Sequence, residues 1–121
     1  MPQIKIGKIK TQIAEKRGWL VGQFMDESEF KDQNIEIYYK TFSVGDTSDK
    51  LHYHPQGKEY MIVLAGKARF RIGDEVLSLE EGDYIAIPNG IPDQIVEVLE
   101  KFTVIGVRNP SVPNNKVFIE E

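Results

Sequence analysis

Short runs of β-branched and aromatic residues, separated by turn residues, make up most of this 121-residue chain. Turn signals recur about every eight to twelve residues, a spacing typical of all-β sandwiches and barrels. One of them, Gly73-Asp74, has the form of a tight hairpin turn between two alternating segments. The pattern predicts an all-β fold with roughly nine or ten short strands. The length suits a single domain, residues 1–121, with one core.

The expected strands differ in how their side chains alternate. Residues 67–72 alternate basic and apolar side chains, which is typical of a strand with one buried face. Residues 60–64 and 102–107 are apolar on both faces, so we expect central strands there. Residues 4–9 alternate isoleucine with lysine and predict a charged edge strand, whereas residues 11–17 predict one helical turn or a loop. The other expected strands cover residues 19–24, 35–43, 52–54, 75–79, 94–99 and 117–119, and a further strand ends in the turn of the segment 82–93.

His52 and His54 are the only histidines of the chain, and one residue separates them. Residues i and i+2 of a β-strand project from the same face, so both imidazoles would point the same way. Two imidazoles on one face are half of a divalent-metal site. The alternative is a pair of edge-strand histidines that are hydrogen-bonded to carboxylates.

A carboxylate follows the histidines across a short turn. Residues 55–58 include a proline and a glycine and can return the chain beside the histidine strand, with Glu59 at the start of the apolar run 60–64. A carboxylate that is buried at the head of an apolar strand needs a partner. Two histidines and one carboxylate suit non-haem iron, manganese or zinc and leave coordination positions open. The alternative is a solvated Glu59.

A second segment rich in glycine and proline ends another strand and supplies a further carboxylate, Asp93. Together the two segments resemble the motifs of the cupin superfamily. The first motif, G-x5-H-x-H-x3,4-E-x6-G, is matched over residues 45–66 with one extra residue before His52. The second motif, G-x5-P-x-G-x2-H-x3-N, is matched at its glycines and proline over residues 82–97. Asp93 replaces the histidine of this motif, and Glu97 replaces its asparagine.

The resemblance implies a fold and a set of metal ligands. The fold is a jelly-roll β-sandwich or barrel, also called a double-stranded β-helix, with a cavity between its sheets. The ligands are His52, His54 and Glu59, with Asp93 at the position of a fourth. A carboxylate in place of an imidazole lowers the charge of the centre and favours iron or manganese, with zinc and nickel as further candidates. Asp93 can instead be a turn residue that accepts a hydrogen bond from its own backbone.

Three other side chains are candidates for the pocket around the metal. Gln56 and Gln94 could donate hydrogen bonds to the ligands. Arg108, at the end of the 102–107 strand, could meet a carboxylate or phosphate of a substrate. For Arg108 the alternative is a solvated strand end. The sequence identifies no catalytic residue and no organic cofactor.

The resemblance allows two classes of function. In the first, a metal-dependent enzyme of the dioxygenase, isomerase or epimerase type acts on a small oxygen-rich molecule at the open positions of the ion. In the second, the protein is a non-catalytic module that binds a sugar or an organic acid. The intact two-histidine, one-carboxylate set favours the enzyme, but a fold alone does not choose among reactions.

Composition limits the partners of the chain. The formal net charge is −4 and no basic patch is evident, which argues against nucleic acids and anionic membranes as partners. The chain has no cysteine, no apolar signal-peptide core and no apolar run of membrane-spanning length, so we expect a soluble cytoplasmic protein. Ile4, Ile6 and Ile9 on the expected edge strand offer a surface for strand exchange. We therefore expect a homodimer that binds a small molecule.

Overall fold

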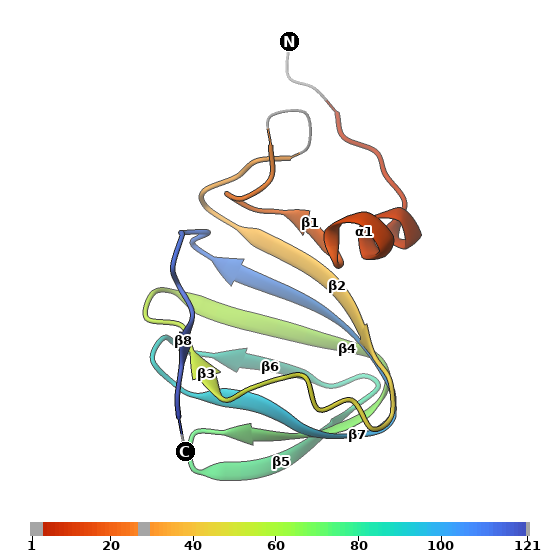
Figure 1. Cartoon of the computed structure of the whole chain (residues 1–121), viewed down its shortest axis with the longest axis vertical. Helices are drawn as coiled ribbons and strands as arrows, with labels where there is room; N and C mark the ends of the chain where they lie inside the picture. Colours follow the sequence, from red (N-terminus) through yellow and green to blue (C-terminus); the bar gives the residue numbers. More distant parts are fainter. Residues whose placement is uncertain (1–3, 27–29, 121) are drawn as a thin grey trace.

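The computed structural model describes residues 4–26 and 30–120. In this part of the chain one helix precedes a curled antiparallel sheet of eight strands (Figure 1). The prediction of an all-β fold is therefore confirmed. The helix is α1 (Ile9–Lys16), and the strands are β1 (Trp19–Val21), β2 (Glu36–Phe42), β3 (His52–Tyr53), β4 (Lys58–Ile72), β5 (Glu75–Glu80), β6 (Tyr84–Ile87), β7 (Asp93–Asn109) and β8 (Val117–Phe118).

Two long strands, β4 and β7, form the frame of the sheet and pair antiparallel along the whole of β4. The expected strand ends at Ala65-Gly66 and around residues 100–101 are wrong, because the pairing continues through both points with shifts in register. Gly66 has a φ of 82°, and a Cβ there would collide with the carbonyl oxygen of Lys101. Only glycine fits such a close approach of two backbones. Near these shifts the sheet curls, so that its two halves face each other (Figure 1).

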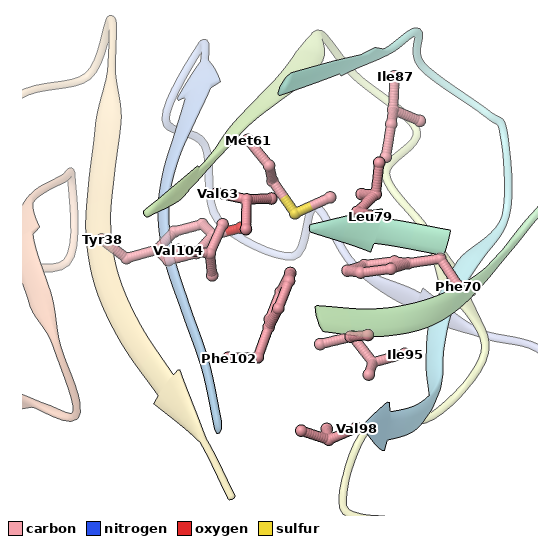
Figure 2. Close-up of a cluster of buried hydrophobic side chains, with 11 residues drawn as sticks. Tyr38, Met61, Val63, Phe70, Leu79, Ile87, Ile95, Val98, Phe102 and Val104 are labelled. Atoms are coloured by element: carbon pink, nitrogen blue, oxygen red, sulfur yellow. The ribbon is translucent and has the colours of Figure 1, made fainter. Parts of the chain in front are cut away.

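The hydrophobic core fills the space between the two halves of the sheet (Figure 2). Its centre is formed by Phe70 of β4 and Phe102 of β7, which are almost completely buried and have ring centroids 5.7 Å apart. Burial of each such ring contributes about 1.5–3 kcal/mol to folding. The other buried members of the cluster are Tyr38, Met61, Val63, Ala68, Leu79, Ile87, Ile95, Val98 and Val104.

The outer face of β4 is only partly covered. Tyr60, Ile62 and Leu64 are 38%, 49% and 39% exposed, although β6 and β7 flank this part of the strand. The strand is central, as predicted. The expectation that both of its faces are buried is wrong, because its outward side chains face away from the core.

The N-terminal segment also differs from the prediction. Residues 4–8 form no strand, and Ile4 and Ile6 are almost fully exposed. Ile9 begins α1, which spans 8 residues and ends at a left-handed Arg17. The edge strand next to β2 is β1, so the expected edge strand in this segment is wrong. No helix among the described residues is long and apolar enough to cross a membrane.

The short strand β3 brings three distant segments of the chain together. His52 lies opposite Asp93, the first residue of β7, and also opposite Phe118 of β8. The C-terminal segment therefore runs back across β3 on the open side of the curled sheet (Figure 1). This arrangement places both sequence motifs and the chain's last strand at one site.

Candidate metal centre

Three of the four predicted metal ligands converge on one point. One side-chain atom each of His52, His54 and Asp93 can be chosen so that all three lie within 4.8 Å of one another. The three side chains are buried, with 4%, 8% and 5% of their surface exposed. The cluster could therefore bind a metal ion, as the sequence predicts.

Backbone carbonyl groups orient both imidazoles. Nδ1 of His52 hydrogen-bonds to the carbonyl oxygen of Lys50, and Nδ1 of His54 hydrogen-bonds to the carbonyl oxygen of Asn115. Because a carbonyl oxygen only accepts, each Nδ1 carries the hydrogen. Each Nε2 therefore presents its lone pair to the site, the arrangement that usually supports a histidine ligand.

The potential ligand atoms of the cluster lie close to one another. Nε2 of His52 is 3.5 Å from Oδ1 of Asp93, and both atoms are acceptors when the carboxylate is ionised. Nε2 of His54 and Oδ2 of Asp93 are buried and have no hydrogen-bond partner in the described part of the chain. Atoms that share a transition-metal ion at about 2.0–2.2 Å lie roughly 3–4 Å apart. A divalent cation could therefore bind between these atoms and give the unpaired ones a partner.

The pKa values of the cluster suit a cation. Burial and then the charge of Arg108 lower the pKa of His54 to about 4, and burial lowers the pKa of His52. Both imidazoles are thus neutral at pH 7, as ligands must be. Burial and then the negative charge of Glu59 raise the pKa of Asp93 to about 8. Without a cation, Asp93 therefore holds a proton at neutral pH.

Glu59 occupies the edge of the cluster. Its Oε1 lies 3.7 Å from Nε2 of His54, while its Oε2 accepts hydrogen bonds from the Tyr38 hydroxyl at 2.8 Å and from Nε of Arg108 at 2.9 Å. Burial alone would raise the pKa of Glu59, but the charge of Arg108 and its other partners outweigh burial and lower it. Glu59 is therefore an ionised carboxylate with one oxygen toward the site, and its role as a ligand stays a prediction.

Arg108 is mostly covered and belongs to an ion-pair network rather than being solvated at a strand end. Besides Glu59, it contacts Oε2 of Glu36 at 3.4 Å. The other oxygen of Glu36 accepts a hydrogen bond from the Ser111 hydroxyl at 3.0 Å. Since both carboxylates are buried, Arg108 compensates charges that would otherwise be costly to bury.

A cavity of about 70 Å³ adjoins the cluster. Neither Gln56 nor Gln94 lines it: the Gln56 backbone hydrogen-bonds to Asn115, and the Gln94 amide donates to the carbonyl oxygen of Asp49. Arg108 does line it, as the sequence suggested. The complete wall is formed by Tyr38, Lys40, Phe42, Asp49, His52, Glu59, Met61, Phe70, Asp93, Ile95, Val104, Arg108 and Lys116.

Several residues of this site lie outside the two sequence motifs. Tyr38 and Lys40 share a face of β2, a spacing visible in the sequence, but the pattern does not say whether that face meets the cavity or solvent. Asn115 and Lys116 reach the site only because the C-terminal segment returns along β3. No local signal in the sequence predicts that return.

The comparisons with known proteins agree with this fold. Together, fold and site define a double-stranded β-helix with a buried cluster that could bind a metal. Residues 38–96 match the family described as the Cupin domain. This match and the double-stranded β-helix fold support a small cupin domain in the chain. A comparison with curated proteins found no match.

Solved structures resemble this chain at low sequence identity. An uncharacterised protein with a double-stranded β-helix domain from Klebsiella pneumoniae is 22% identical, with a TM-score of 0.62 over 74% of this chain and 77% of that chain. A DMSP lyase from Ruegeria pomeroyi is 22% identical, with a TM-score of 0.67 over 83% of this chain and 49% of that chain. A variant of Bacillus subtilis oxalate decarboxylase is 23% identical, with a TM-score of 0.61 over 72% of this chain.

The present chain spans only part of the length of the lyase and of the decarboxylase. It covers about half of the lyase chain and 24% of the decarboxylase chain. At identities of 22% and 23%, the likeness shows a shared fold.

Proposed function

We propose that the protein binds a divalent metal ion through His52, His54, Glu59 and Asp93. The observation that carries the proposal is the pair of buried, unpartnered atoms, Nε2 of His54 and Oδ2 of Asp93, at the centre of the cluster. Leaving such atoms without a partner costs about 1–3 kcal/mol each, and a cation removes that cost. Two neutral imidazoles and two carboxylates favour iron(II) or manganese, with zinc and nickel as weaker candidates.

With the ion bound, we propose that the protein is an enzyme that acts on a small oxygen-rich molecule. The ion would supply Lewis-acid or redox chemistry. Arg108 and the Tyr38 hydroxyl hold Glu59 in place, while apolar side chains such as Phe70 and Val104 line part of the cavity. The reaction would be of the dioxygenase, isomerase or epimerase type. The lyase and the decarboxylase among the similar structures indicate that one fold accommodates several reactions.

A non-catalytic module that binds a sugar or an organic acid is the second candidate. It is favoured by the state of two polar side chains in the cavity wall. The Tyr38 hydroxyl already donates to Glu59, and burial raises its pKa well above 10, while Arg108 is shared between Glu59 and Glu36. Side chains that are already bonded to buried carboxylates are better suited to positioning a ligand than to transferring protons.

Turnover assays separate the two candidates. The protein loaded with iron(II) or manganese is expected to convert at least one member of a panel of small diols, thiols and keto acids, with oxygen uptake as one readout. A His52→Ala, His54→Ala variant is the matched control and should be inactive. If no member reacts with any metal while one of them binds saturably, the enzyme proposal is wrong and the binding module is supported.

We also propose that the protein forms a homodimer through the outer face of the sheet rather than through its N-terminal segment. Neighbouring strands present uncharged side chains at this face, so two copies would meet without unpaired charges in a two-fold contact. The face consists of Ile37, Tyr39, Tyr60, Ile62, Leu64, Tyr84, Ala86, Ile105 and Val107.

Light scattering tests the proposed dimer. The parent protein is expected to be dimeric, and Ile62→Lys, which places a charge at the centre of the face, is expected to be monomeric. Val76→Lys is the control, because Val76 is an exposed apolar residue of β5, outside the face. A monomeric parent protein, or a dimeric Ile62→Lys variant, would contradict the proposal.

A further inference from the structure

Two lysine side chains in the wall of the cavity beside the candidate metal site have no acidic partner among the described residues. Lys40 and Lys116 both line the cavity, and neither forms an ion pair with a described residue. The Lys40 ammonium group lies 4.7 Å from the centroid of the Trp19 ring and 5.0 Å from that of Tyr38. The Lys116 ammonium group lies 5.3 Å from the centroid of Phe118. Aromatic rings therefore hold both cations beside the cavity.

A bound metal ion leaves the cavity with an excess of positive charge. Its wall contains three carboxyl groups and three cationic side chains. When a divalent ion displaces the proton of Asp93, two positive charges are in excess, or one if the buried Glu36 beside Arg108 is also counted. Burial and then the charges of Arg108 and Lys116 lower the pKa of Lys40 to about 8. Its ammonium form is already destabilised, so a nearby anion would stabilise it.

The size of the cavity limits the anion. A volume of about 70 Å³ has space for on the order of five water-sized groups, since about 10–15 Å³ of such volume holds one water molecule. A ligand of about that many non-hydrogen atoms fits inside the cavity. A carboxylate with a short carbon chain meets both the charge and the size requirement, and it is rich in the oxygen atoms that hard metal ions prefer.

We infer that the ligand of this cavity is a small carboxylate whose charged end binds to Lys40 and Lys116 beside the metal site. This inference rests on the metal-binding part of the proposed function and holds for an enzyme or a binding module. It assigns a role to Lys40, the side chain of β2 that follows Tyr38 on the inner face of the sheet. The competing explanation is that both lysines only offset the carboxylates of the metal-free cavity.

Calorimetric titration of the manganese-loaded protein with glycolate tests the inference, and glycolamide is the uncharged probe of matched size. Glycolate is expected to bind saturably and at least about tenfold more tightly than glycolamide, because a charged hydrogen bond is worth more than a neutral one. Lys40→Gln should weaken glycolate binding by about tenfold to a hundredfold, and Lys116→Gln by several-fold, given the greater exposure of Lys116. Lys40→Arg retains the charge and should retain most of the affinity.

The manganese affinity of each variant provides the second readout. Lys40→Gln should bind manganese as tightly as the parent or more tightly, because it removes a positive charge near the ion. Lys10→Gln, at an exposed position of α1, removes the same charge far from the cavity and should change neither affinity.

The results test the metal site and the carboxylate assignment separately. If the parent binds no manganese, both the metal site and this inference are wrong. If manganese binds but glycolamide matches glycolate, or if Lys40→Gln and Lys116→Gln leave glycolate affinity unchanged, the carboxylate assignment is wrong while the metal site stands. In that case glycolate binds through the metal alone, and the lysines serve only to balance charge.

Discussion

Replacing both histidines, His52→Ala and His54→Ala, is expected to abolish stoichiometric metal binding. The two Nε2 atoms are half of the proposed donor set. Of the two remaining ligands, Glu59 is hydrogen-bonded to Arg108, and a proton competes with the ion for Asp93. Loss of one residue that merely orients a ligand costs about tenfold to a hundredfold in metal affinity, so the loss of two ligands should exceed a hundredfold. Calorimetric titration with manganese at pH 8 measures the effect.

A variant of the residue between the histidines is the control for this experiment. Tyr53 belongs to β3, but its side chain alternates to the opposite face from His52 and His54. Tyr53→Ala therefore disturbs the same strand without removing a donor and should bind manganese like the parent. A double-histidine variant that kept the parent's affinity would show that the ion binds elsewhere.

Manganese affinity is expected to rise with pH because of Asp93. Its pKa of about 8 means that the proton on its carboxyl group competes with the cation below that pH. Each unit below the pKa should therefore cost about a factor of ten, and affinity should level off above pH 8. His54, with a pKa of about 4, is already neutral throughout this range and adds no slope.

Asp93→Asn separates a ligand from a turn residue. If Asp93 is a ligand, the variant should lose both the pH slope and at least about a hundredfold in affinity at pH 8. The metal-free variant should be more stable than the metal-free parent at that pH, by on the order of a few kcal/mol. The sign follows because the folded pKa of Asp93 is raised, so the parent loses stability as pH rises from about 4 to 8, whereas asparagine does not ionise.

Urea unfolding of both metal-free proteins measures this difference in stability. If Asp93 is only a turn residue, both the manganese titration and the urea unfolding should give a different result. Asp93→Asn would then leave manganese affinity unchanged and would slightly destabilise the protein, since a local hydrogen bond would be lost.

The fold and the centre of the site could be predicted from the sequence because both depend on local patterns. Turn residues and alternation predicted the β-strands, and the cupin motifs predicted which side chains would meet. His52, His54 and Asp93 do meet, although Asp93 departs from the histidine of the family pattern. The spacing of the second motif placed this carboxylate correctly even though the residue type had changed.

Features that depend on the packing of distant segments could not be read from the sequence. The strand that contains residues 60–64 was expected to end at Ala65-Gly66, yet β4 continues through Gly66, which allows two long strands to approach closely and bend together. Arg108 resembled a solvated strand end until its partners, Glu36 and Glu59, were seen beside it. Lys116 enters the cavity wall only because β8 pairs with β3.

Elemental analysis of the protein purified without a polyhistidine tag tests the metal site most directly. After incubation with iron(II) or manganese and gel filtration at pH 8, the parent is expected to retain about one ion per chain, since the proposed set of two imidazoles and two carboxylates would bind a transition-metal ion tightly. The double-histidine variant is expected to retain almost none. A parent protein that holds no more metal than this variant would contradict the metal site on which the proposed function depends.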